Sequence, residues 1–189
     1  MLNIILASAS PRRQELLRQV GVSFRVIPSN VDEQVAVPMQ PGELVEHLAV
    51  SKARDVAVGH PDALVIGADT IVVVAGEILG KPKDRADAVA MLQRLSGGAH
   101  EVMTGVAIIG AGREAVFHEV TTVHFVALAQ DQIERYVDSG EPMDKAGAYA
   151  IQGRAGAMIS GIAGDYFNVV GLPICRTVQL LSNFGVTVL

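Results

Sequence analysis

The sequence predicts an α/β fold in which a mixed sheet is flanked by helices. In the first half of the chain, apolar runs rich in β-branched residues alternate with longer amphipathic segments, which is typical of strands connected by helices. In the second half, a short glycine-containing turn separates two strand-like segments, which is typical of an antiparallel hairpin. Parallel and antiparallel connections together indicate a mixed sheet.

The first three elements are marked by an apolar run and by turn residues. Residues 2–7 are mostly apolar and are predicted to form a buried strand. Pro11 suits the first position of a helix and Gly21 suits the end of one, so a helix is expected over residues 11–20. Residues 22–27 alternate as a strand does.

The next three elements continue this alternation. A helix is expected over residues 41–58, because the segment begins with a proline and is followed by Gly59. Residues 64–74 contain a β-branched run, which favours a strand. Asp84 is expected to cap a third helix, which runs to about residue 95, before a pair of glycines.

The rest of the chain contains the hairpin and the last two helices. Residues 110–115 match the glycine pattern of a dinucleotide-binding loop, but such a loop has to be followed by a helix. The residues that follow are rich in valine, threonine and phenylalanine, which favours a hairpin turn instead. The expected elements are strands over 102–109 and 115–126, a helix over 130–138, short strands and turns over 147–164, and a helix over 173–184.

The composition predicts one folded domain, residues 1–189, in a reducing compartment. Half of the 189 residues are hydrophobic and 19% are charged, which excludes intrinsic disorder. No internal repeat or linker divides the chain. The single cysteine, Cys175, allows no internal disulfide, which fits the cytoplasm.

Charge and hydropathy argue against two classes of partner. The formal net charge is −5, whereas proteins that bind nucleic acids usually carry a basic excess. The longest apolar stretch, residues 63–75, is interrupted by Asp69 and is too short to span a bilayer. The N-terminal residues lack the basic leader that is typical of a secretory signal peptide. We therefore expect a cytoplasmic protein with neither nucleic acid nor a membrane as partner.

The run Ser8-Ala9-Ser10-Pro11-Arg12-Arg13 is the first candidate site. It stands where the first strand turns into the first helix, and a helix N-terminus carries unpaired N–H groups and a partial positive charge. Two arginines are unfavourable there unless an anion such as a phosphate also binds. The alternative is that both arginines point to water.

Asp69 and Lys52 are charged residues within apolar patterns. Asp69 stands between two apolar runs, where a buried carboxylate needs a metal, a cation or several donors. Gly67 could let a ligand or metal approach it. Alternatively, Asp69 is a turn residue bonded to nearby N–H groups. Lys52 falls inside the apolar arc of the second helix, where it either extends past the core or points into a cleft.

Three further candidates lie in predicted loops. An acidic pair such as Asp32-Glu33, a lysine such as Lys81 and a glutamine such as Gln152 usually contact solvent. The pair could instead hold Mg²⁺ beside a substrate phosphate, and the Gln152 amide could pair with a nucleobase edge. Basic residues and carboxylates at element ends suit a polyphosphate and its divalent metal. The residues alone therefore indicate metal-assisted phosphate chemistry or the binding of a phosphate ligand.

A set of short motifs resembles the signature of the Maf family of nucleotide pyrophosphatases. The motifs follow the family's order and cover nearly the whole chain: Leu6-Ala7-Ser8-Ala9-Ser10-Pro11-Arg12-Arg13, Gly67-Ala68-Asp69-Thr70, Gly80-Lys81-Pro82, Thr104-Gly105-Val106 and Gly140-Glu141-Pro142. The resemblance implies an inosine-triphosphatase-like α/β fold with two lobes around a cleft. It also implies hydrolysis of nucleoside triphosphates to the monophosphate and pyrophosphate. A homodimer is expected on this ground alone.

The resemblance also implies roles for individual residues. Residues 144–153 are similar to the branch that acts on dTTP and UTP. Asp69 would accept a proton, and Glu33 with Asp69 would hold a divalent cation. Oxygen ligands suit Mg²⁺, Mn²⁺ and Co²⁺ alike. The residues expected to set substrate specificity are Arg12, Thr70 and Gln152, and those expected to complete the phosphate site are Ser8, Arg13, Lys52 and Lys81.

A second hypothesis needs no catalysis. The name of the family comes from an association with septum formation, so the chain could bind a nucleotide as a regulator of cell division without turning it over. Release of pyrophosphate separates the two hypotheses, because a regulator of this kind binds nucleotide and releases none.

Overall fold

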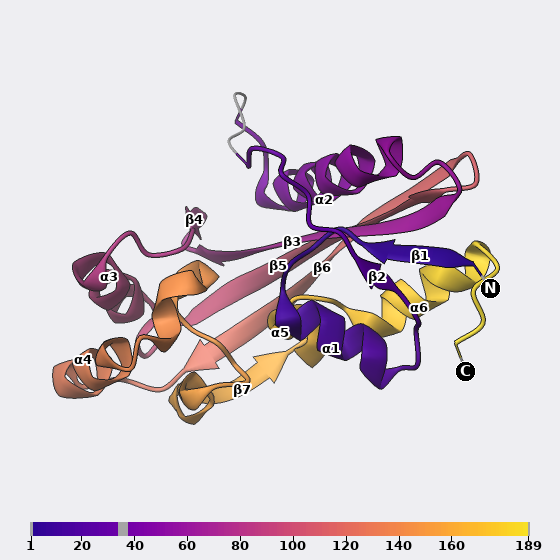
Figure 1. Ribbon diagram of the computed structural model, residues 1–189. Coiled ribbons are helices and arrows are strands. Elements are labelled where there is room, and N and C mark those ends of the chain that lie inside the picture. Colours follow the sequence, from indigo (N-terminus) through magenta and orange to yellow (C-terminus); the bar gives the residue numbers. More distant parts are fainter. Residues whose placement is uncertain (1, 34–37, 189) are drawn as a thin grey trace. The chain divides into compact units, whose positions relative to one another are not determined.

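The computed structural model describes residues 2–33 and 38–188. Within these residues the strands form one seven-stranded mixed sheet, in the order β2-β1-β3-β5-β6-β7, with β4 paired to β3 (Figure 1). Strand β1 is parallel to β2 and β3, whereas β4 and β7 are antiparallel to their neighbours. The strands are β1 (Asn3–Leu6), β2 (Arg25–Val26), β3 (Ala63–Val74), β4 (Glu77–Leu79), β5 (Ala99–Gly110), β6 (Arg113–Phe125) and β7 (Ile159–Ala163).

Six α-helices and three 3₁₀-helices are found in the described residues. The α-helices are α1 (Pro11–Gln19), α2 (Pro41–Val58), α3 (Arg85–Leu95), α4 (Gln130–Asp138), α5 (Tyr166–Val170) and α6 (Ile174–Asn183). The 3₁₀-helices are η1 (Glu141–Asp144), η2 (Ala146–Ala148) and η3 (Arg154–Met158). No helix in the described part of the chain is both long and apolar enough to cross a membrane. The predicted α/β class with a mixed sheet is confirmed.

The chain divides into two compact units. Unit 1 comprises Met1–Asp69, Thr104–Glu119 and Gly171–Leu189, and unit 2 comprises Thr70–Met103 and Val120–Val170. Each unit is assembled from segments that are distant in the sequence. The single domain expected over residues 1–189 stays a prediction.

In unit 1, helix α2 packs closely on the strands through small side chains. Its residues Ala49 and Ala53 share a buried cluster with Ile5 of β1 and Val65 of β3. Figure 1 shows α2 on one side of these strands and α1 with α6 on the other. The small side chains bring the helix backbone near the strands, and this distance matters for the site described below.

Unit 2 is built around α3 and α4, which contact each other, and around an aromatic cluster. His100, Phe125 and Tyr149 meet edge to face, with ring centroids 4.9 to 5.3 Å apart. Nε2 of His100 lies 2.8 Å from the hydroxyl oxygen of Tyr149. Burial lowers the pKa of His100 to about 4, so the imidazole is neutral at pH 7.

The hairpin predicted in place of a dinucleotide loop is confirmed. Strands β5 and β6 are neighbours in the sheet, and the turn residues Ala111 and Gly112 have φ values of 50° and 69°. Positive φ at both central residues is the geometry of the two-residue turn that matches strand twist. The dinucleotide interpretation is excluded because a strand follows the turn.

Other expectations differ from the structure in detail. The strand predicted over residues 22–27 is reduced to β2, and the sequence prediction omitted β4 and α5. Residues 147–164 contain two 3₁₀-helices besides one strand, because glycines with positive φ, such as Gly147, turn the chain repeatedly. Short elements of this kind depend on tertiary contacts and carry little periodic signal.

Candidate active site

The candidate site begins where the parallel strands β1 and β3 end. The register pairs Leu6 with Ile66, and the N–H of Ala7 donates to the carbonyl of Ile66 at 2.8 Å. Ser8 therefore leaves the sheet beside the segment of β3 that carries Asp69. The carboxyl ends of parallel strands are the usual place for ligands in α/β sheets.

Arg13 folds back onto the loop that precedes its own helix. Ser10 caps α1, and its hydroxyl oxygen accepts from the N–H of Arg13 at 3.5 Å. Nη1 of Arg13 donates to Oγ of Ser8 at 3.1 Å, and Nε donates to the carbonyl of Gly171 at 2.8 Å. The alternative in which Arg13 points to water is therefore wrong, because its guanidinium is bound to protein groups.

The charges around Arg13 perturb its ionisation. Burial lowers the pKa of Arg13 below its ordinary value; the carboxylate of Asp69 opposes this shift, Arg12 adds to it, and Glu33 opposes it. Arg13 stays a cation, because the arginine guanidinium is not deprotonated in proteins. The four side chains therefore interact within one charged environment.

Lys52 joins the two carboxylates of this environment. Its Nζ lies 2.6 Å from Oδ1 of Asp69 and 2.7 Å from Oε1 of Glu33. The side chains of Lys52 and Asp69 are 12% and 10% exposed, whereas that of Glu33 is 57% exposed. Lys52 therefore does not extend past the core to solvent, because its ammonium group contacts two carboxylates. The buried Asp69 carboxylate is compensated by this ammonium group, as the location of Asp69 in an apolar strand requires.

Gly67 explains how Lys52 reaches Asp69. A Cβ atom on Gly67 would lie 2.2 Å from the carbonyl oxygen of Ala49 and 2.9 Å from Cβ of Ala53, both on α2. Residues two apart on a strand point to the same side, so Asp69 faces α2 as well. The glycine makes room for the helix backbone. The interpretation that Gly67 admits a ligand or metal is therefore wrong.

These side chains form what we call the charged cluster: Ser8, Arg12, Arg13, Glu33, Lys52 and Asp69, all in unit 1. Its three cations and two carboxylates suit a polyphosphate accompanied by a cation. The carboxylates of Glu33 and Asp69 converge on one ammonium group, so a hard divalent cation fits the same oxygen donors. Among the described residues no group of three or more metal-ligating side chains occurs. Phosphate oxygens and water would therefore have to supply the remaining ligands.

The other predicted site residues belong to unit 2. Thr70 follows Asp69 on β3 and is half-buried, while Lys81 and Gln152 are exposed. Gln152 lies in a tight turn, in which the N–H of Gly153 donates to the carbonyl of Ala150 at 3.0 Å. The structure therefore describes Thr70, Lys81 and Gln152 within unit 2.

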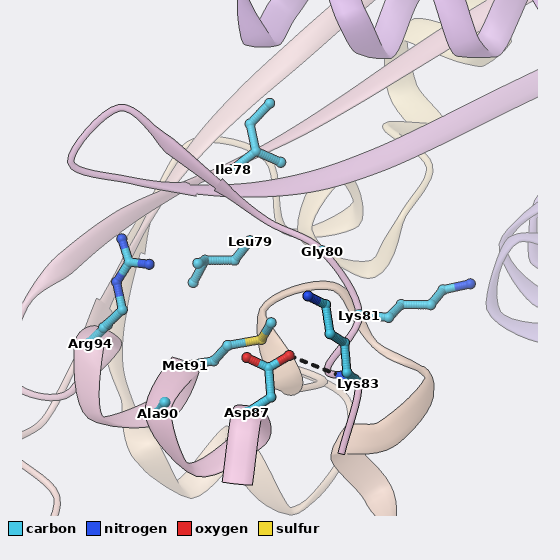
Figure 2. Close-up of a pocket in the computed structure, with 9 residues that line it drawn as sticks. All are labelled: Ile78, Leu79, Gly80, Lys81, Lys83, Asp87, Ala90, Met91 and Arg94. Carbon is cyan, nitrogen blue, oxygen red and sulfur yellow. Dashed lines mark hydrogen bonds between the residues drawn. The ribbon is translucent and has the colours of Figure 1, made fainter. Parts of the chain in front are cut away.

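Lys81 also borders a pocket of about 350 Å³ in unit 2. The pocket lies between α3 and β4 with the segment that follows β4, and Figure 2 shows the Lys81 side chain extending away from Met91 and Asp87. The dashed line in Figure 2 is the hydrogen bond from the N–H of Lys83 to Asp87, at 2.9 Å. Of the predicted site residues, Lys81 is in the lining.

Sequence reasoning missed two groups that hold predicted residues in place. One is the carbonyl of Gly171, which accepts from Arg13 across 158 residues of sequence. The other is Glu141, whose carboxylate contacts the backbone beside Gln152. A main-chain carbonyl leaves no residue signal, whereas Glu141 was visible in a motif without an assigned role.

The α/β fold and the charged cluster are suited to binding a phosphorylated ligand. Comparisons with known proteins make this specific. The chain is 61% identical to a dTTP/UTP pyrophosphatase of Symbiobacterium thermophilum, over 98% of this chain and 95% of the relative. It is 55% identical to a dTTP/UTP pyrophosphatase of Moorella thermoacetica, over 100% of this chain and 98% of the relative.

The family model described as "Maf-like protein" matches residues 3–184, so the chain belongs to the Maf family. Among solved structures, the Staphylococcus aureus Ham1 protein aligns with 96% of this chain and 97% of its own, at a TM-score of 0.51 and 18% identity. This likeness concerns the fold alone, and it agrees with the inosine-triphosphatase-like fold that the family resemblance implies.

Proposed function

We propose that this protein hydrolyses dTTP and UTP to the nucleoside monophosphate and pyrophosphate. Its membership of the Maf family, together with relatives at 55–61% identity that are named dTTP/UTP pyrophosphatases, makes it a nucleoside triphosphate pyrophosphatase. The observation that supports catalysis in this chain is the buried Asp69, held by Lys52 at the carboxyl edge of β1 and β3.

Asp69 acts as the general base in this proposal. It accepts a proton from the water whose oxygen attacks the α-phosphorus, and the bond from that phosphorus to the bridging oxygen breaks. Lys52 holds the Asp69 carboxylate in place through the 2.6 Å contact. Pyrophosphate leaves with the electron pair of the broken bond.

Cationic side chains stabilise the charge that develops on the phosphates. Arg12 and Arg13 stand in the first turn of α1, where the helix N-terminus adds a partial positive charge. Because Arg13 is fixed by Ser8 and Gly171, its guanidinium is preorganised, which is what electrostatic stabilisation of a transition state needs. Lys81 adds a further cation.

Glu33 and Asp69 would hold a divalent cation, Mg²⁺, Mn²⁺ or Co²⁺. Such a cation, when bound, polarises phosphate oxygens and offsets their charge. Thr70 and Gln152 select the base, and the Gln152 amide offers a donor and an acceptor to the carbonyl and N3–H of thymine or uracil. Arg12 also contributes to substrate specificity.

The test is a panel of nucleotides with separate detection of pyrophosphate and orthophosphate. The purified protein is incubated with dTTP, UTP, CTP, dATP, GTP and 7-methyl-GTP, with each divalent cation and with a chelator. We expect pyrophosphate mainly from dTTP and UTP, and none once the cation is removed.

Other outcomes contradict specific parts of the proposal. Release mainly from 7-methyl-GTP would contradict the assigned base preference. Orthophosphate alone would show attack at the γ-phosphorus. Nucleotide binding without release of either product would favour the regulator of cell division instead.

A further inference from the structure

The turn that carries Gln152 is bounded by a carboxylate from another segment. We call Ala150–Gly153 the Gln152 turn. Directly after it, the N–H of Arg154 donates to Oε2 of Glu141 at 3.2 Å. A Cβ atom on Gly153 would lie 2.1 Å from Oε1 of Glu141. The carboxylate therefore lies against the turn's backbone, in space that only a glycine leaves open.

A second hydrogen bond orients this carboxylate. The hydroxyl of Tyr136, a buried residue of α4, donates to Oε1 of Glu141 at 2.9 Å. Ser139 ties the same segment together, because its hydroxyl donates to the carbonyl of Tyr136 at 2.6 Å and accepts from the N–H of Glu141 at 3.4 Å. Both carboxylate oxygens of Glu141 are thus committed to positioned donors, and charge-assisted bonds of this kind are stronger than neutral ones.

The other end of the turn is fixed independently. Tyr149 precedes the turn and is buried, with its ring against His100 and Phe125 and its hydroxyl 2.8 Å from Nε2 of His100. One end of the turn is therefore held by an aromatic core contact and the other by Glu141. Gln152 itself is exposed at the tip.

We propose that Glu141 is a positioning residue for substrate selection: its carboxylate, oriented by Tyr136, fixes the Gln152 turn so that the Gln152 amide meets the base in one orientation. This inference rests on the proposed function of Gln152. An amide can discriminate bases only if its donor and acceptor are aligned with the base edge. In a catalytic site, displacement of a substrate or a positioning group by about 1 Å can lower the reaction rate about a hundredfold.

The main test compares Glu141→Gln with a matched control, Glu134→Gln. Glu141→Gln keeps the size of the side chain but turns one of its two acceptors into a donor. Glu134 accepts from Gln130 within α4, so Glu134→Gln makes the same chemical change without a contact to the turn. Thermal unfolding establishes that both variants are folded.

Two readouts are expected to change in Glu141→Gln and not in Glu134→Gln. Hydrogen exchange at the Arg154 amide should become about tenfold faster or more, because the uncharged side chain keeps one acceptor for two donors, the Tyr136 hydroxyl and the Arg154 N–H, and the charge-assisted bond is lost. The ratio of kcat/KM for dTTP to that for CTP should fall about tenfold to a hundredfold, through KM for dTTP rather than kcat. Tyr136→Phe should move both readouts in the same direction by less.

Gly153→Ala tests whether the effect passes through the carboxylate. The added methyl group should displace the Glu141 carboxylate and lower the same ratio. In a Glu141→Ala background, Gly153→Ala should change the ratio little further, because the group it displaces is already absent. Additive effects of the two substitutions would contradict the proposal.

The remaining outcomes separate this inference from the proposed function. An unchanged Arg154 exchange rate or an unchanged dTTP-to-CTP ratio in folded Glu141→Gln would overturn the inference. If the wild type releases no pyrophosphate from any nucleotide, the proposed function is overturned. The inference is then decided by the ratio of Kd values for dTTP and CTP, measured calorimetrically in the wild type and in Glu141→Gln.

Discussion

At the scale of single residues, Asp69 is the group on which the proposed chemistry depends. Asp69→Asn keeps the size of the side chain and an oxygen that can accept from Lys52, but it removes the base. We expect kcat for dTTP to fall at least about a hundredfold, with cooperative thermal unfolding retained. Asp62→Asn, at an exposed turn, is the control and should act as the wild type does. Activity of Asp69→Asn within a few-fold of the wild type would exclude Asp69 as the base.

Lys52 offsets the repulsion between the neighbouring carboxylates of Glu33 and Asp69. Lys52→Met leaves Asp69 and Glu33 facing each other without their shared ammonium group. We expect the free energy of unfolding to fall by about 1–3 kcal/mol, measured by urea titration. Lys83→Met, an exposed lysine of unit 2, should leave it nearly unchanged.

The same variant tests the predicted cation site. If Glu33 and Asp69 bind a divalent cation, Mg²⁺ or Mn²⁺ should raise the Tm of Lys52→Met more than that of the wild type, because the competing ammonium group is gone. An equal or smaller shift in Lys52→Met would argue against these two residues as the cation ligands.

At the scale of elements, the close packing of α2 on β3 decides the geometry of the charged cluster. Gly67→Ala would place Cβ 2.2 Å from the carbonyl oxygen of Ala49, so the helix has to move. We expect a loss of about 1–3 kcal/mol in the free energy of unfolding. Activity should fall as well, since Lys52 moves with α2.

Gly161→Ala is the matched control for this prediction. Gly161 lies in β7, and a Cβ atom there would meet open space. Its free energy of unfolding should stay within about 0.5 kcal/mol of the wild type. Equal losses in the two variants would show that the close approach of α2 is not the cause.

At the scale of the whole molecule, the buried His100 makes stability depend on pH. Its folded-state pKa of about 4 lies below the ordinary 6.5 because of burial, with a smaller contribution from His124. A depressed histidine pKa means that the unfolded state binds the proton more readily. Stability should therefore fall as the pH drops from about 6.5 to about 4, by up to about 3 kcal/mol, and level off below.

The measurement is urea unfolding at pH 7 and pH 4.5. His100→Gln cannot take up this proton, so its difference in unfolding free energy between the two pH values should be smaller than that of the wild type. His60→Gln, on a partly exposed loop, serves as the control. A difference in His100→Gln equal to that in the wild type would show that His100 is not the responsible group.

Local sequence signals predicted the elements with strong periodicity or capping. The start of α3 follows from the Asp84 cap, and the β5–β6 hairpin follows from the turn at Ala111 and Gly112. The helix predicted over residues 130–138 coincides with α4. The short β2, β4 and α5 were reduced or missed, since they are too brief to carry a period.

The sequence by itself also determined the family and the residue types of the site, because short motifs in a fixed order can be recognised without knowledge of the fold. Only the tertiary structure decided how these residues pair. Lys52 and Asp69 are 17 positions apart and meet because Gly67 admits α2, and Arg13 meets the carbonyl of Gly171 across 158 positions. Such contacts depend on the register of strands and on the distance between packed backbones, and neither quantity is encoded in any local stretch of the chain.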